Sequence, residues 1–201
     1  MALAEREIVQ NDETADDARP LLWTKEQYYK MGEMGLFGDA RVELIEGEII
    51  EMPPIGTRHF TSVGLATQVL NRIFGENYCV MPQNSFNAGP GAEPQPDIAV
   101  YEGNIRDFAD ALPTTALLVV EVADSTLHSD RTRKAKLYAG RGIQDYWIIN
   151  LRGNLLEVHR QPTTRPDQPV AYKNVLTLTA DDAVAPLAAP NSPISVADLL
   201  P

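Results

Sequence analysis

The sequence predicts an α/β fold, a mixed sheet of the α+β type flanked by helices, on three observations. Short apolar runs with the character of strands recur along the chain, among them YCVM, DIAVY and DYWIINL. A stretch at about 57–74 has apolar residues at helical spacing, and the dipeptides Glu46-Gly47 and Gly153-Asn154 each separate two strand-like runs, as in a hairpin. This mixture of elements is typical of a sheet with helices on its faces.

The first half of the chain predicts a short helix, a hairpin and a long helix. Thr24 and Gln27 have the spacing of a capping box ahead of EQYYKMGEM, so we expect a helix that ends near Gly35 or Gly38. The hairpin follows at RVELIEGEIIEM. The apolar positions of the long helix, TRHFTSVGLATQVLNRIF, are Val63, Ala66, Val69, Leu70 and Ile73.

The second half predicts most of the sheet. YCVM and DIAVY are separated by NSFNAGPGAEPQP, a loop rich in Gly, Pro and Asn. The aliphatic run ALLVVEVADS is the next expected strand, followed by a helix over about 129–141, the strand DYWIINL and a hairpin into LLEVHR. One more strand is expected over 170–178.

Length and composition indicate one domain with two tails. The chain has 201 residues, 44% of them hydrophobic, and we expect an acidic disordered tail over 1–20, a single domain over 21–180 and a loose extension over 181–201. No run approaches the ~20 apolar residues that span a bilayer, and the N-terminus lacks a signal-peptide pattern. We therefore expect a cytoplasmic protein without a membrane partner. The single cysteine, Cys79, excludes an internal disulfide.

The charge is acidic overall but uneven. The formal net charge is −11, which disfavours broad attraction to nucleic acid because Lys and Arg make the phosphate contacts. Six acids and two bases in the first twenty residues account for −4 of this charge. The sequence still leaves room for a local basic face, because five bases lie close together, at Arg131, Arg133, Lys134, Lys136 and Arg141.

Glu121 is the least expected residue, because it lies inside the aliphatic run LLVVEV. Such a run is typical of a strand covered on both faces, where an unpaired carboxylate would be costly or would take up a proton. We therefore expect a cation to compensate Glu121. Asp97 opens the strand DIAVY, and strand ends of one sheet can bring it beside Glu121. Glu43 shares a strand face with Ile45, which favours an inward orientation.

Helical geometry places Lys134 at the same site. At about 100° per residue it shares the apolar face of Leu127 and Tyr138, so it can reach back toward the strand that precedes the helix. Three carboxylates and a lysine indicate a site for a hard divalent cation such as Mg²⁺, which polarises a phosphodiester while the lysine orients or activates the attacking water.

Ordinary structural roles remain open for each residue of this set. Asp97 can be a turn residue after a proline, and Glu43 can be a solvent-exposed strand residue. Lys134 can be the i,i+4 partner of Asp130.

The motifs have a recognisable order. They are VELIEGEI, His59, a PD at a strand start, EVADST after an aliphatic run, then Asp130, Lys134 and Tyr138, and finally GIQDYWIIN. This order resembles the Uma-type restriction endonuclease family of the PD-(D/E)XK nuclease superfamily. The resemblance covers about Leu22 to Arg160 and implies a restriction-endonuclease-like fold.

The resemblance also implies roles. Asp97 and Glu121 match the acids of the superfamily pattern that bind the metal, and Glu43 matches the early acid that completes the site. The lysine of the pattern would stand at Ala123. In Uma-type proteins a lysine from the next helix takes its place, and here the matching residue is Lys134.

Three functions follow as hypotheses. The first is a Mg²⁺-dependent endonuclease acting on DNA, with Mn²⁺ as a substitute and with Glu43, Asp97, Glu121 and Lys134 as the catalytic set; the preference for DNA comes from the resemblance alone. The second is a catalytically silent nuclease-fold module that binds nucleic acid or regulates. The third is a structural ion site.

A homodimer is also expected, because many superfamily nucleases dimerise. His59 is expected to cap a helix or to pack against neighbouring residues.

Overall fold

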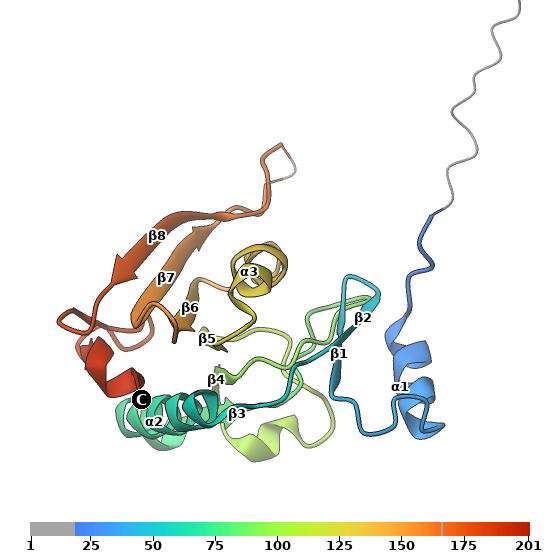
Figure 1. The fold of residues 1–201 in the computed structure, drawn as a ribbon, viewed down its shortest axis with the longest axis horizontal. Coiled ribbons are helices and arrows are strands. Elements are labelled where there is room, and N and C mark those ends of the chain that lie inside the picture. Colours follow the sequence, from blue (N-terminus) through green and yellow to red (C-terminus); the bar gives the residue numbers. More distant parts are fainter. Residues whose placement is uncertain (1–18, 166) are drawn as a thin grey trace, which may run out of the picture.

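A six-stranded mixed sheet forms the centre of the protein (Figure 1). The computed structural model describes residues 19–165 and 167–201, so the expected acidic tail lies almost entirely outside the described residues. The strand order is β3-β4-β5-β6-β7-β8, and all neighbours are antiparallel except β5 and β6. This confirms the predicted class. The strands are β3 (Tyr78–Pro82), β4 (Ile98–Glu102), β5 (Leu118–Ala123), β6 (Asp145–Asn150), β7 (Leu155–Pro162) and β8 (Tyr172–Leu178).

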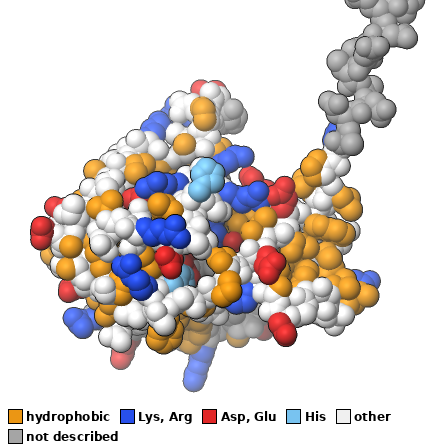
Figure 2. All heavy atoms as spheres, viewed as in Figure 1, with side chains coloured by type: hydrophobic (Ala, Val, Ile, Leu, Met, Phe, Trp, Pro, Cys, Tyr) orange, Lys and Arg blue, Asp and Glu red, His pale blue; other side chains and the backbone are white. Residues whose placement is uncertain are grey.

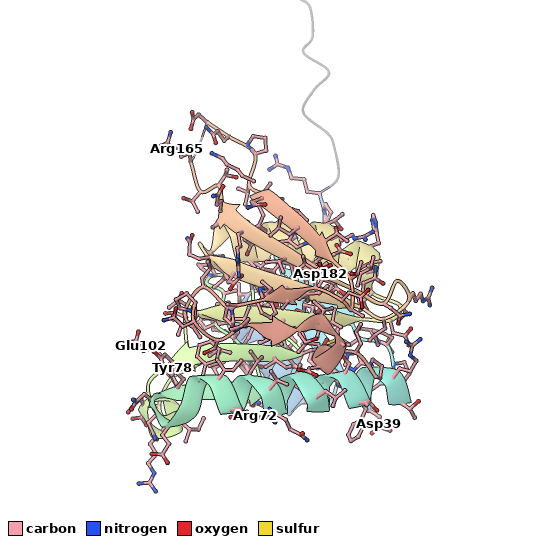
Figure 3. All side chains as sticks on the ribbon, turned by 90° about the vertical axis from the view of Figure 1, so that its left-hand side faces the viewer. Asp39, Arg72, Tyr78, Glu102, Arg165 and Asp182 are labelled. Atoms are coloured by element: carbon pink, nitrogen blue, oxygen red, sulfur yellow. The ribbon has the colours of Figure 1, made fainter. Side chains whose placement is uncertain are left out.

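Helices cover both faces of the sheet. On one face lies α2 (Thr57–Phe74), which runs alongside the strands in Figure 3 and buries Val63, Ala66 and Leu70 in the core. Three consecutive helical segments cover the other face and connect β5 to β6, which allows these two strands to be parallel. They are α3 (Leu127–Ser129), the π-helical turn η3 (Asp130–Lys134) and α4 (Ala135–Gly140).

A helix and a hairpin lie on the side of the molecule away from β7 and β8 (Figure 1). The predicted capping box of Thr24 and Gln27 is present at the start of the helix. The predicted hairpin turns at Glu46 and Gly47, both with positive φ, as its tight turn requires. Leu44 of the hairpin pairs with Glu93 in the loop before β4. These elements are α1 (Lys25–Glu33), β1 (Val42–Ile45) and β2 (Glu48–Glu51).

The helix predicted over 129–141 is present but irregular. Its middle is the π-helical turn, in which the Asp130 carbonyl accepts the N–H of Ala135. The same carbonyl accepts the Tyr146 hydroxyl at 2.9 Å. A side chain that enters the helical hydrogen-bond ladder is a known cause of such distortions. The turn ends at Lys134, so it helps to set the direction of that side chain.

The C-terminal segment is not the loose extension that its composition predicts. Val184, Ile194, Val196 and Leu199 are buried in the core that also contains α2. Ser62 of α2 donates a hydrogen bond to the Leu199 carbonyl at 2.7 Å, and the C-terminus lies beside α2 in Figure 1. The prediction was wrong because these isolated apolar residues form no periodic pattern. The short elements here are β9 (Ala183–Val184), β10 (Ile194–Ser195) and η4 (Val196–Leu199), and those elsewhere are η1 (Gly75–Asn77) and η2 (Ile105–Phe108).

Within residues 19–165 and 167–201, no helix is long and apolar enough to cross a bilayer.

Candidate active site

A cavity of about 500 Å³ lies where the β1–β2 hairpin faces the adjoining ends of β4 and β5. All four predicted site residues line it: Glu43, Asp97, Glu121 and Lys134. Its hairpin side has the charged residues Arg41, Glu43 and Glu51 and an apolar group formed by Ile50, Met52, Pro53, Pro54 and Ile55. The structure therefore brings together side chains from four separate parts of the sequence around one solvent-accessible space.

The pairing of β4 with β5 places Asp97 beside Glu121. Ile98 pairs with Val120 in this antiparallel register, and Asp97 is the preceding residue. One oxygen of Asp97, Oδ2, accepts the backbone N–H of Val122 at 2.8 Å. This bond fixes the carboxylate at the edge of the cavity, so the strand ends meet as the sequence predicts.

Glu121 is buried, with 2% of its surface exposed. Its Oε1 atom accepts hydrogen bonds from Lys134 Nζ at 3.0 Å and from the Tyr138 hydroxyl at 2.9 Å. Burial raises the pKa of Glu121 well above its usual value; the Lys134 ammonium opposes this, and the neighbouring acids add to it. In the described part of the chain, Glu121 Oε2 receives no hydrogen bond. The cation expected from the sequence is thus the Lys134 ammonium.

Lys134 joins two of the acids. Its Nζ lies 3.3 Å from Glu43 Oε1 as well as 3.0 Å from Glu121 Oε1. Burial alone would lower the pKa of Lys134, but the two glutamates outweigh it and the pKa lies above its usual value. The simple i,i+4 pairing with Asp130 is not how Lys134 is compensated, because its ion pairs are made to these two glutamates instead.

The π-helical turn that carries Lys134 is anchored to β6 and β7. Besides the Tyr146 hydroxyl, it is held by Arg131, which donates two hydrogen bonds to Glu157 of β7, at 2.9 and 2.6 Å. Burial would raise the pKa of Glu157, but the bonds from Arg131 dominate and lower it. These contacts hold the first two residues of the turn, so Lys134 is positioned by strands that do not line the cavity.

Glu43 is not the solvent-exposed strand residue of the ordinary interpretation, because only 3% of its surface is exposed. Its Oε2 atom accepts the backbone N–H of Gln95 at 3.1 Å, while the Gln95 side chain donates to the Val42 carbonyl at 3.3 Å. Gln95 was not among the residues predicted for the site. Its position two residues before Asp97, in PQPD, was the feature of the sequence that could have indicated it.

Two further residues approach the acids. His59 Nε2 lies 3.0 Å from Asp97 Oδ1, and its buried Nδ1 has no partner in the described part of the chain. His59 does not cap α2, whose N-cap is Gly56 without a side-chain bond. Asp130 lines the cavity and accepts the Thr126 hydroxyl at 2.6 Å; burial raises the pKa of Asp130 to about 6.

The carboxylates of the cavity supply part of the ligand set of a hard divalent cation. Among the residues that the structure describes, no three His, Cys, Asp or Glu side chains are grouped so that they could hold an ion by themselves. Mg²⁺, however, is commonly held by one or two carboxylates while it keeps several waters and binds substrate phosphates. Asp97 and Glu121 supply two carboxylates at one cavity, and Glu121 Oε2 is available.

The fold and the paired acids at adjoining strand ends define a restriction-endonuclease-like protein. The chain belongs to the Uma2 family, described as "Putative restriction endonuclease", whose family model matches residues 26–195. A crystal structure described as "a putative nuclease belonging to DUF820" from Anabaena variabilis is similar, with a TM-score of 0.66 and 20% identity, over 90% of this chain and 97% of that one. At this identity the similarity confirms the fold alone. No curated protein matches the chain.

Proposed function

We propose that this protein is a Mg²⁺-dependent endonuclease that hydrolyses phosphodiester bonds of DNA. The observation that carries the proposal is the convergence of Asp97 and Glu121 on one cavity with the Lys134 ammonium in contact with Glu121. Membership of a restriction endonuclease family supports the same class of reaction and a nucleic-acid substrate.

Asp97 and Glu121 would hold the cation, which when bound polarises the phosphodiester and promotes ionisation of water. Asp97 is kept in place by the Val122 N–H and by His59. Glu121 is kept in place by the Tyr138 hydroxyl, which also leaves its second oxygen free. These contacts hold the carboxylates in position before substrate arrives.

Lys134 would stabilise the negative charge that develops on the phosphate or orient the attacking water. An ammonium has three N–H donors; one of them bonds to Glu121 Oε1 at 3.0 Å, and Glu43 Oε1 forms a longer ion pair at 3.3 Å. A donor therefore remains for a phosphate oxygen or a water. Glu43 contributes by holding Lys134 and supporting the metal site, and Gln95 holds Glu43.

The experiment is a cleavage assay with Mg²⁺ or Mn²⁺ on single-stranded, double-stranded and branched DNA, comparing the wild type with Glu121→Gln. The matched control is Glu102→Gln, an exposed glutamate at the opposite end of β4. We expect cleavage by the wild type and the control and none by Glu121→Gln. Equal cleavage by all three proteins would refute the assignment.

A catalytically silent module is the second candidate. The observation that favours it is that the Lys134 ammonium already forms ion pairs with Glu43 and Glu121. This function predicts salt-dependent DNA binding with no Mg²⁺-dependent cleavage, which the same assay detects.

Homodimerisation remains a prediction. Figure 2 shows a broad apolar surface on the side where Figure 1 places α1. Exposed large side chains in this part of the chain are Leu21, Leu22, Tyr29, Met34 and Leu36. Light scattering measures the mass in solution, and we expect twice the chain mass of 22.1 kDa.

A further inference from the structure

The basic cluster of the sequence does not form a free basic face. Four of its five bases contact glutamates. A phosphate would have to compete with these glutamates for each base. The pairs are Arg131–Glu157, Arg133–Glu48, Lys134 with Glu43 and Glu121, and Lys136–Glu46.

Two arginines differ from this cluster, one that lines the cavity and one beside it. Within residues 19–165 and 167–201, neither Arg41 nor Arg58 forms an ion pair with a carboxylate. Arg41 lines the cavity and is exposed. Arg58 is exposed, and one of its nitrogens donates to the Leu151 carbonyl and to Asn154 Oδ1, each at 3.2 Å. These neutral acceptors orient the guanidinium but leave its charge uncompensated.

The two arginines come from different elements around the site. Arg41 directly precedes β1 of the hairpin, whereas Arg58 is in the first turn of α2, next to the cavity residue His59. A guanidinium binds phosphate well because its planar donors match two phosphate oxygens. A nucleic-acid backbone with one phosphate at the acids could therefore place neighbouring phosphates at Arg41 and Arg58.

An exposed aromatic side chain lies on the same turn of α2. Phe60 is 74% exposed, and its N–H bonds to the carbonyl of Gly56, a cavity residue one turn earlier. Side chains on a helix lean toward the preceding turn, so the ring leans toward the cavity side of α2. Gly56 and Gly64, one turn on either side of Phe60, present no side chain to cover it.

The cavity is small. A space of about 500 Å³ holds a nucleotide-sized part of a strand. Exposed aromatic rings bind nucleic acid by stacking on bases, which requires bases that are not covered by neighbours in a duplex.

We propose, on the basis of the proposed nuclease function, that Arg41 and Arg58 bind phosphates on either side of the acidic cavity, that Phe60 stacks on a base, and that the substrate presents a short unpaired strand. Single-stranded ends, flaps and bubbles present such an unpaired strand, whereas a continuous duplex does not.

The test measures binding by the full-length Glu121→Gln protein in Mg²⁺, using fluorescence anisotropy with a labelled single strand of about a dozen nucleotides and the blunt duplex of the same sequence. We expect the single strand to bind more tightly. Arg41 and Arg58 together should contribute about −1.4 to the slope of log K against log salt, at about 0.7 each. Duplex binding that is equal or tighter, or absence of binding to both, would overturn the inference.

Single substitutions in the same background separate the three contacts. Arg41→Ala and Arg58→Ala should each weaken binding and reduce the slope by about 0.7, and Phe60→Ala should weaken binding at least about 5-fold without changing the slope. Arg72→Ala is the matched control, because Arg72 is exposed near the far end of α2 (Figure 3). An unchanged slope in both arginine variants would overturn the assignment. All these side chains are exposed, and circular dichroism checks that each variant is folded.

The outcome is separable from the nuclease proposal. If the wild type cuts duplex DNA as fast as single strands, the nuclease proposal stands and this inference fails. If single strands bind with the expected slope and no substrate is cut, the binding inference stands and the nuclease proposal fails.

Discussion

Two buried carboxylates on adjacent strands of the sheet, Asp145 on β6 and Glu121 on β5, have opposite environments. Asp145 is fully buried, and both of its oxygens accept hydrogen bonds. The donors are the Arg160 guanidinium, the Trp147 indole and the Leu187 N–H, at 2.8 to 3.2 Å. Glu121 is just as buried, but both of its donors share one oxygen, and it lines the cavity.

The difference separates a structural charge from a functional one. Asp145 and Arg160 tie the C-terminal segment to the sheet, since Arg160 also donates to the Ala185 carbonyl at 2.7 Å. A buried carboxylate with a free oxygen and a raised pKa is the costlier arrangement, and such groups are concentrated at functional sites. Substitutions at the two positions should therefore have opposite consequences.

The largest expected effect is on cleavage by Glu121→Gln. The substitution keeps the shape of the side chain but removes a metal ligand, so the rate should fall on the order of 10³-fold or more. The free energy of unfolding should change by less than about 1 kcal/mol, because Lys134 keeps its ion pair with Glu43 when the Glu121 charge is removed. Rate measurements and urea unfolding on the same samples check both parts. A loss of stability with retained cleavage would show that Glu121 has the structural role and not the functional one.

Asp145→Asn should have the converse effect. It leaves the Arg160 guanidinium without its carboxylate in a largely buried place, so the free energy of unfolding should fall by about 3 kcal/mol or more. Cleavage by the remaining folded protein should be unchanged, because Asp145 does not line the cavity. A change in stability below about 1 kcal/mol, measured by urea unfolding, would argue against the structural role.

A pH series sharpens the comparison at Asp130, a further buried acid of the site. Burial raises the pKa of Asp130 to about 6 in the folded protein, from 3.8. Between these values the unfolded chain loses a proton that the folded protein keeps, so this group lowers stability as the pH rises from about 4 to 6. Relative to the wild type, Asp130→Asn should gain up to about 3 kcal/mol between pH 4 and pH 7. A pH-independent difference between the two unfolding curves would contradict the raised pKa.

The smallest effect is expected from Tyr146→Phe. It removes the hydrogen bond to the Asp130 carbonyl while it keeps the ring in the core, so stability should fall by about 1 kcal/mol. If this bond positions Lys134, the loss of stability caused by Tyr146→Phe should be smaller in a protein that also carries Lys134→Met. A double-mutant cycle on unfolding free energies measures this coupling, and strictly additive effects would show that the π-helical turn is held without the hydroxyl.

Much of the site could be predicted because local patterns specify it. The aliphatic run around Glu121 indicates a buried strand, PD marks a strand start, and antiparallel pairing then brings Asp97 to Glu121. Lys134 shares a helix face with Tyr138, and both side chains do reach Glu121.

Other features depend on contacts between distant residues. The π-helical turn involves the Tyr146 hydroxyl, sixteen residues beyond Asp130, which helical spacing does not reveal. The contacts of Gln95 with Glu43 and of His59 with Asp97 cross from one element to another. The burial of the C-terminal segment depends in the same way on the Asp145–Arg160 pair.

The central claim, a metal site formed by Asp97 and Glu121, is tested most directly by calorimetric titration of Mn²⁺ and Mg²⁺ into the wild type, Asp97→Asn and the control Glu102→Gln. The account predicts binding by the wild type and the control, and loss of binding in Asp97→Asn. Equal binding by all three proteins would contradict it, as would absence of binding by the wild type even with a single-stranded oligonucleotide present.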